Sequence, residues 1–274
     1  MHTGKVIIAG AGPGDPGLLT LKTAQYLQQA DVVLVDRLVS ETIITDHVRE
    51  DATCIYVGKQ CRKGLSVPQS TINGLMVQHA VEGKLVVRLK GGDVSVFSNV
   101  LDELETLVAH NIAYEIVPGV TAALGAAACA GIPLTARGYT TAVRLLTCYT
   151  SDVLPQSYWQ ELAQTNDTLV FYMSSETLET VAANLVQYGI DAGKKLAVIE
   201  QATTPLQQVT LFDLYDARQP WRNRKWKSPA LLIVGSVTTL HERFGWLPGS
   251  NRDEHYFPPI TGASALVVQQ PKVA

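Results

Sequence analysis

The chain has 274 residues, of which 46% are hydrophobic and 17% charged, and its formal net charge at pH 7 is −3. This length suits two domains, and the composition excludes wholesale disorder. The small negative charge gives no indication of nucleic-acid binding, so a polyanionic ligand would need a local basic patch.

The first half of the chain alternates short apolar runs with helical patterns. Strands are predicted at residues 6–9, 31–35, 54–58, 84–89 and 114–117, and helices at 18–29, 70–82 and 102–110. Strands rich in Val, Ile and Leu that alternate with helices are typical of a mostly parallel α/β sheet. Thr121 and Ala122 open a further helix rich in Ala and Gly.

The same pattern restarts after Pro133, which predicts a second domain. Strands are expected at residues 143–149, 168–173, 195–200 and 229–235, and helices at 157–163 and 176–188. We therefore predict an N-terminal α/β domain at residues 1–137 and a C-terminal α/β domain at 138–248. Residues 249–274 show no periodicity and predict a mobile tail.

Several classes of site and segment are disfavoured. The stretch 117–134 is weakly polar, but it contains Pro118 and Pro133 and is mostly Ala, so a membrane span explains it poorly. The apolar run near the N-terminus is too short for a signal peptide. No cysteine pair or histidine pattern has the spacing of a zinc site, and no disulfide framework is apparent. A cytoplasmic protein without a bound metal is expected.

The loop after the first predicted strand has two readings. Residues 10–17 read GAGPGDPG, and Asp36 follows the next strand, as in a dinucleotide-binding fingerprint. An NAD-dependent enzyme is therefore one alternative. Against it, Asp15 occupies the third glycine position, and Pro13 and Pro16 remove N–H groups that a phosphate would need. In the alternative, purely structural interpretation, the loop is a tight turn and Asp15 caps the helix that follows it.

Six further strings follow one another in a characteristic order. They are DRLVS (36–40), VGK (57–59), RLKGGD (88–93), VPGVTA (117–122), GIPLT (131–135) and SPALLIVG (228–235). Together with the glycine loop, they resemble the uroporphyrinogen III C-methyltransferases of the tetrapyrrole methylase family. The resemblance covers roughly residues 4–247.

The resemblance implies a two-domain tetrapyrrole methylase fold with a cofactor cleft between the domains, and usually a homodimer. It implies transfer of methyl groups from S-adenosylmethionine to two pyrrole carbons of uroporphyrinogen III. The products are S-adenosylhomocysteine and precorrin-2, which leads to sirohaem or cobalamin. Asp36 matches the family's proton acceptor and Lys59 its proton donor. Without the resemblance, these would read as a turn residue and a surface lysine.

Further positions match the family's cofactor contacts. By resemblance they are Pro13, Gly91, Gly92, Asp93, Val96, Thr121, Ala122, Met173 and Ala202. A substrate with many carboxylates also requires cations in the site. The cations near these strings, of which we expect only some to serve, are Arg37, Lys59, Arg62, Lys63, Arg88, Lys90, Arg137 and Arg144.

The chain departs from the family pattern in its loops. Residues 94–101 lack the usual arginine and its flanking glycines, Ala136 replaces a histidine, and Gln60 replaces an arginine. The usual Asn-Gly-Thr is Gln201-Ala202-Thr203. These changes leave open a divergent enzyme, a paralogue that acts on another tetrapyrrole, and a non-catalytic regulatory protein on the same scaffold.

Overall fold

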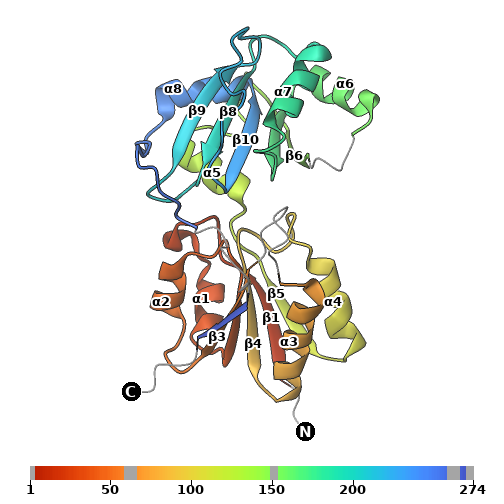
Figure 1. The fold of residues 1–274 in the computed structure, drawn as a ribbon, viewed down its shortest axis with the longest axis vertical. Helices are drawn as coiled ribbons and strands as arrows, with labels where there is room; N and C mark the ends of the chain where they lie inside the picture. Colours follow the sequence, from red (N-terminus) through yellow and green to blue (C-terminus); the bar gives the residue numbers. More distant parts are fainter. Residues whose placement is uncertain (1–3, 59–66, 149–153, 258–265, 270–274) are drawn as a thin grey trace. The chain divides into compact units, whose positions relative to one another are not determined.

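The computed structural model describes residues 4–58, 67–148, 154–257 and 266–269. The chain divides into two compact units, shown in Figure 1. Unit 1 comprises Met1–Thr121 and Phe257–Ala274, and unit 2 comprises Ala122–Tyr256. The chain therefore passes from unit 1 to unit 2 after Thr121, whereas the boundary predicted from the sequence falls after residue 137. The reason is helix α5 (Ala122–Ala130), which packs on a strand of unit 2.

Unit 1 is built on a six-stranded sheet in the order β11-β3-β2-β4-β1-β5. Its strands are β1 (Lys5–Gly10), β2 (Val32–Val35), β3 (Thr53–Val57), β4 (Leu85–Lys90), β5 (Ala113–Val117) and β11 (Leu266–Gln269). All neighbours pair in parallel except β11, which runs antiparallel to β3. The parallel sheet predicted for the first half is confirmed.

Helices cover both faces of this sheet (Figure 1). Alternate strand residues such as Ile8 and Leu34 pack with α3 (Gln69–Val81) and α4 (Val100–Ala109). The intervening residues, such as Ile7 and Val33, pack with α1 (Leu21–Leu27) and α2 (Glu41–His47). Burial on both faces explains why these strands read as continuous apolar runs in the sequence.

Unit 2 contains a five-stranded sheet in the order β6-β7-β10-β8-β9. Its strands are β6 (Val143–Thr147), β7 (Thr168–Tyr172), β8 (Lys195–Glu200), β9 (Gln208–Asp213) and β10 (Ala230–Gly235). Here β6 and β7 are parallel, whereas β10 is antiparallel to β7 and β8, and β9 is antiparallel to β8. The expectation of a mostly parallel sheet is wrong for this unit, because β8, β9 and β10 follow one another without crossover helices.

The helices of unit 2 are α5, α6 (Gln156–Gln164), α7 (Leu178–Gln187) and the short α8 (His241–Phe244). Trp159 of α6 stacks on Phe171 of β7, with ring centroids 6.5 Å apart. No helix in the described ranges has the length and apolar character to cross a membrane.

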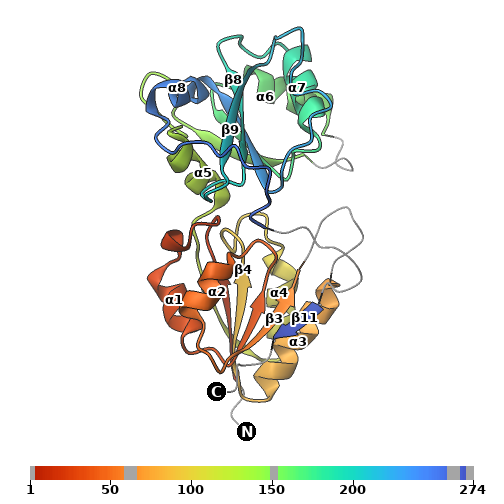
Figure 2. The same ribbon diagram turned by 60° about the vertical axis from the view of Figure 1, so that its left-hand side comes forward.

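The structure describes part of the stretch 249–274, for which a mobile tail is predicted. Residues 250–256 are hydrogen-bonded within unit 2, and Phe257 is buried. Strand β11 then lies beside β3 at the edge of the unit 1 sheet (Figure 2), with Leu266 opposite Val57.

Candidate functional site

The residues singled out in unit 1 gather at the carboxyl edge of its parallel sheet. Pro13 follows β1, Asp36 follows β2, Gly91 follows β4, and Gly119 follows β5. Ligand sites of α/β sheets form at this edge. The topology therefore brings together loops that are more than a hundred residues apart in the chain.

Three of these loops touch through glycine backbones. Gly12 and Gly92 exchange backbone hydrogen bonds of 3.1 and 2.7 Å. A Cβ on Gly10 would lie 2.6 Å from Gly92 O, and one on Gly119 would lie 2.4 Å from the same oxygen. Glycine is thus required at positions 10 and 119 because backbone occupies the space of a side chain. Gly91 and Gly92 are half-buried, so their backbone is partly open to a ligand.

The Asp93 carboxylate joins two of the loops. Its Oδ2 accepts a hydrogen bond from the Gly119 N–H at 2.9 Å, and its Oδ1 accepts from the N–H and the hydroxyl of Ser95. Burial acts to raise the pKa of Asp93, but the hydrogen bonds from Ser95 and Gly119 outweigh it and hold the pKa below its usual value. Asp93 therefore links the loop after β4 to the loop after β5 by hydrogen bonds.

Asp36 lies beside the end of β4. Its N–H donates to Leu89 O at 3.0 Å, and its Oδ1 accepts from the Arg37 N–H. A Cβ on Gly91 would lie 2.8 Å from Leu38 Cβ, so the loops that carry Asp36 and Gly91 are in contact. Asp36 is half-buried. Lys59, the other catalytic candidate, lies outside the described residues.

The glycine loop continues into a capped 3-10 turn. Asp15 caps the turn Pro16–Leu18 and accepts a hydrogen bond from the Gly17 N–H at 2.8 Å. Thr20 caps α1 in the same way through the Thr23 N–H. Asp15 thus caps a 3-10 turn, close to the alternative reading of this loop, whereas the helix α1 itself is capped by Thr20. A carboxylate at this turn opposes a pyrophosphate, which weakens the NAD reading.

Two predicted cofactor positions remain in unit 1. Val96 lies in the loop between β4 and α4 and is half-buried. Phe97 and Asn99 in the same loop have left-handed backbones, with φ values of 51° and 55°. This is where the family pattern has glycines around an arginine. Thr121 is the last residue of unit 1 and is also half-buried.

Strand β4 and helix α4 share a buried cluster of three charged side chains. Glu103 of α4 is fully buried and accepts from Arg88 Nε at 3.0 Å and from Lys90 Nζ at 2.7 Å. Arg88 also donates to the carbonyls of Leu34 and Leu89. Burial and the neighbouring Arg88 lower the pKa of Lys90, although Glu103 acts in the opposite direction. Arg88 and Lys90 are thus internal charges rather than surface cations that a substrate would meet.

Unit 2 presents its candidates at one edge of its own sheet. Met173 follows β7 with a φ of 52°, and about a third of its surface is exposed. Ala202 follows β8, which is parallel to β7 because both pair antiparallel with β10. The N–H of Ala123 donates to the Tyr172 hydroxyl at 2.9 Å, so Ala122 at the start of α5 lies close to the end of β7.

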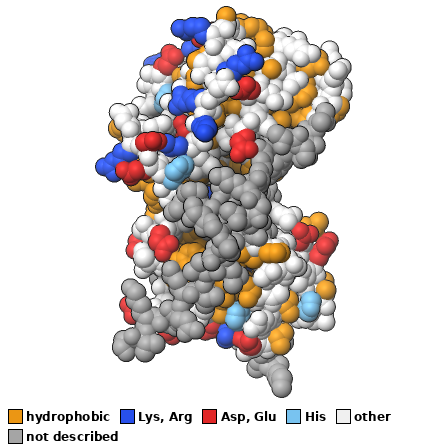
Figure 3. All heavy atoms as spheres, viewed as in Figure 1, with side chains coloured by type: hydrophobic (Ala, Val, Ile, Leu, Met, Phe, Trp, Pro, Cys, Tyr) orange, Lys and Arg blue, Asp and Glu red, His pale blue; other side chains and the backbone are white. Residues whose placement is uncertain are grey.

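The other candidate cations divide into three groups. Arg144 is engaged by Asp167 at 2.6 Å and by Glu161. Lys59, Arg62 and Lys63 lie outside the described residues, whereas Arg137 is exposed and Arg37 half-buried. On the face of unit 2 seen in Figure 3, Lys and Arg side chains lie among acidic ones. Among the residues that the structure describes, fewer of the candidate cations are accessible than the sequence suggests.

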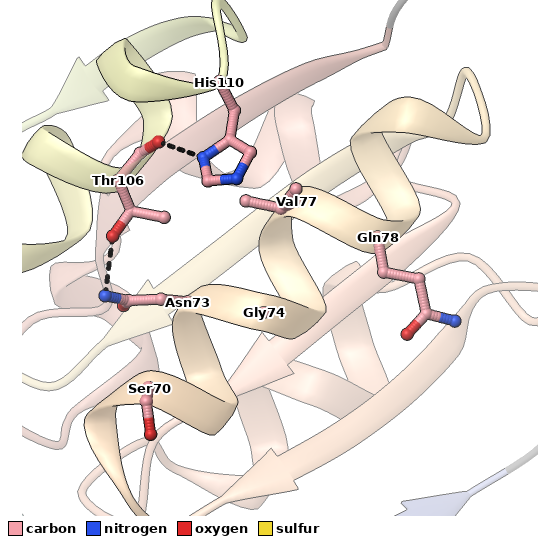
Figure 4. Close-up of a pocket in the computed structure, with 7 residues that line it drawn as sticks. All are labelled: Ser70, Asn73, Gly74, Val77, Gln78, Thr106 and His110. Atoms are coloured by element: carbon pink, nitrogen blue, oxygen red, sulfur yellow. Dashed lines mark hydrogen bonds between the residues drawn. The ribbon is translucent and has the colours of Figure 1, made fainter.

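Unit 1 also has an open groove between α3 and α4, shown in Figure 4. Ser70, Asn73, Gly74, Val77, Gln78, Thr106 and His110 line it. Three of its polar residues bond to one another: Asn73 donates to Thr106 Oγ1 at 2.8 Å, and the His110 ring contacts Thr106 O at 2.9 Å. None of the predicted site residues that the structure describes lines this groove, which is therefore separate from the described part of the candidate site.

The glycine contact gives a first testable prediction. Gly119→Ala is expected to destabilise unit 1 by about 1–3 kcal/mol, because the new Cβ overlaps backbone that must move. Gly74→Ala is the matched control, since a Cβ there meets nothing within 4 Å and α3 gains helix propensity. Urea unfolding of both variants measures the difference. A Gly119→Ala variant as stable as Gly74→Ala would contradict the close contact.

Comparison with known proteins agrees with this arrangement. The chain is 45% identical over 269 residues to the siroheme synthase of Neisseria meningitidis serogroup B, and 44% identical over 251 residues to that of Pseudomonas putida. These alignments cover 96% and 92% of this chain but only 54% of each relative. The chain thus spans about half the length of the curated relatives it matches.

Solved structures give the same picture. The uroporphyrin III C-methyl transferase of Thermus thermophilus matches with a TM-score of 0.72 and 34% identity, over 86% of this chain and all of that chain. A second structure of that enzyme, complexed with S-adenyl homocysteine, matches equally well. A cobalt precorrin-4 methyltransferase matches with a TM-score of 0.73 and 29% identity, over 85% of this chain and 95% of that one.

The two-sheet α/β architecture expected from the sequence strings is therefore confirmed. The model of the tetrapyrrole (corrin/porphyrin) methylases matches residues 5–218, which is well over half of the chain. The chain belongs to the tetrapyrrole methylase family.

Proposed function

We propose that the chain transfers methyl groups from S-adenosylmethionine to ring carbons of a tetrapyrrole, and that the acceptor is uroporphyrinogen III, which becomes precorrin-2. The observation that carries this proposal is the meeting of the Gly10, Gly92 and Gly119 backbones beside Asp36 in a chain of this family. The relatives named siroheme synthase and uroporphyrin III C-methyl transferase support this acceptor.

The residues present fit the proposed cofactor. Gly91 and Gly92 offer half-buried backbone without side chains, and Met173 is partly exposed at the end of its strand. We propose that the family-matched positions contact it: Pro13, Gly91, Gly92, Asp93, Val96, Thr121, Ala122, Met173 and Ala202. Because the Asp93 carboxylate is engaged by Ser95 and Gly119, we assign its contact to the backbone.

The proposed methyl transfer also requires a proton acceptor, a proton donor and cations for the substrate carboxylates. When bound, S-adenosylmethionine would supply a methyl group on a sulfonium, and transfer of that methyl group to an electron-rich pyrrole carbon would leave a neutral thioether. The methylated ring must then release a proton, and we assign its acceptance to Asp36 and a proton-donating role to Lys59. Exposed cations such as Arg137 hold substrate carboxylates. We further propose a homodimer, which light scattering of the purified chain tests.

A paired measurement tests this function. We expect S-adenosylhomocysteine to bind in calorimetry, while anaerobic turnover of uroporphyrinogen III is weak. The substrate side lacks the family's arginine after Phe97, its histidine at Ala136 and its arginine at Gln60. Each lost charge-assisted contact costs about 1.5–3 kcal/mol, or roughly one to two decades of affinity.

The outcomes separate the alternatives. Turnover at an ordinary rate with low-micromolar substrate would show that the altered loops do not impair the reaction. Binding of the cofactor without turnover of any tetrapyrrole would favour a regulatory protein on the same scaffold. Binding of NADH in place of S-adenosylhomocysteine would overturn the methyltransferase proposal.

A further inference from the structure

The loop after β8 carries Ala202 in an unusual backbone conformation. Gln201 and Thr203, on either side of Ala202, have left-handed φ values of 49° and 66°. Residues other than glycine seldom adopt this conformation and need surrounding structure to hold them in it. The loop is almost entirely buried: Gln201 is 1% exposed and Thr204 2%. Its shape is therefore fixed by the groups that bond to it.

Part of that support comes from the loop itself. The Thr203 N–H donates to Gln207 Oε1 at 2.8 Å, and the Thr204 hydroxyl donates to Gln201 O at 2.7 Å. The Gln201 N–H donates to Pro229 O at 2.7 Å, at the start of β10. These bonds satisfy backbone groups of the loop. They leave the buried amide side chain of Gln201 still in need of partners.

The segment 249–256 supplies two of those partners. Gln201 Oε1 accepts from the Tyr256 N–H at 2.7 Å, and its Nε2 donates to Glu254 O at 3.1 Å. A third, longer contact of 3.4 Å runs to Leu206 O within the loop. The Gln201 amide thus binds the segment through two hydrogen bonds, donating one and accepting the other. A single buried residue ties the segment to the position next to Ala202.

Further bonds hold the same segment along the loop and its neighbours. The Ser250 N–H donates to Gln207 O at 2.8 Å, and Gln208 Nε2 donates back to Ser250 O. Lys227 Nζ donates to Arg252 O at 2.9 Å. The segment is therefore bonded to unit 2 at both of its ends and in its middle. Every group named here belongs to unit 2.

We propose that the segment 249–256 is a positioning element of the cofactor site: through Gln201 it holds the loop that carries Ala202, so that cofactor binding and the order of this segment are coupled. The proposal rests on the proposed function, in which Ala202 contacts S-adenosylmethionine. Gln201 acts as a positioning residue and has no part in the chemistry. The family pattern has an asparagine at this place, and the longer glutamine side chain is the one that grips the segment.

Hydrogen exchange on the full-length chain tests the coupling directly. Addition of S-adenosylhomocysteine is expected to slow amide exchange in residues 201–207 and in 250–256 together. Residues 184–190 are the internal reference, because they end α7 and lead toward the start of β8, whereas the loop 201–207 follows the end of that strand. Protection of the loop without any change in 250–256 would overturn the proposal.

A matched pair of variants provides the second test. Gln201→Leu removes both hydrogen bonds to the segment, whereas Gln164→Leu removes an exposed glutamine bond to the carbonyl of Tyr188, away from the loop. We expect Gln201→Leu to speed exchange in 250–256 and to raise the Kd for S-adenosylhomocysteine roughly tenfold, the equivalent of one hydrogen bond. We expect kcat at saturating cofactor to change little, and Gln164→Leu to bind the cofactor as the wild type does.

The outcomes distinguish the proposed coupling from the proposed methyltransferase function on which it rests. A Gln201→Leu variant that releases the segment yet keeps the wild-type Kd overturns the coupling and leaves the methyltransferase proposal standing. A wild-type chain that binds no S-adenosylhomocysteine overturns the proposed function, and the coupling with it. If Gln201→Leu does not fold, the exchange experiment on the wild type still decides the matter.

Discussion

Glu103→Gln is expected to lower the free energy of unfolding of unit 1 by about 3–5 kcal/mol, because it leaves two buried cations without a carboxylate. Arg88 is 2% exposed and Lys90 3%, so water does not replace the lost partner. Glutamine matches glutamate in volume, and the effect therefore reports charge rather than packing. Urea unfolding measures the loss, and hydrogen exchange in β4 assigns it to unit 1.

Two comparisons sharpen this test. Glu105→Gln, on the exposed side of the same helix, is expected to change stability by less than about 0.5 kcal/mol. The triple variant Arg88→Met, Lys90→Met and Glu103→Leu is expected to recover most of the loss, because replacing a whole buried ion cluster with apolar groups is often neutral. If Glu103→Gln were as stable as Glu105→Gln, the cluster would contribute nothing to folding.

Asp36→Asn is expected to lower kcat for methyl transfer by about 10²- to 10⁴-fold, the usual contribution of a general base. Asparagine keeps the shape of the side chain and an acceptor for the Arg37 N–H, but it cannot take the proton from the methylated ring. The Kd for S-adenosylhomocysteine is expected to stay near the wild-type value. Single-turnover kinetics with saturating cofactor separates the chemical step from binding.

Asp46→Asn is the control, since this exposed aspartate of α2 lies away from the edge where the loops meet. A parallel loss of cofactor affinity in Asp36→Asn would point to a structural role for the carboxylate. Unchanged kcat would remove Asp36 from the reaction and leave the proton acceptor to be found among the other groups of this edge.

The sequence alone determined most of unit 1. Its strands are buried on both faces, so their apolar runs stand out, and parallel strands place the loops that follow them at one edge. The ordered strings from Asp36 to Thr121 indicated the family, and a capping role for Asp15 was one of the two readings of its loop. The roles of Asp36 and Lys59 came from resemblance, and they remain predictions.

Only the tertiary structure decided which charges face inward and how residues 201–228 and 249–257 are arranged. Arg88 and Lys90 follow a strand just as surface cations do, and only the position of Glu103 on α4 shows that they are buried. The sequence did not predict strands β9 and β11, which lie at the edges of their sheets. Residues 250–256 have no periodicity at all, because their order comes from single hydrogen bonds to Gln201, Gln207 and Lys227. Such contacts join residues far apart in the chain, and no local pattern records them.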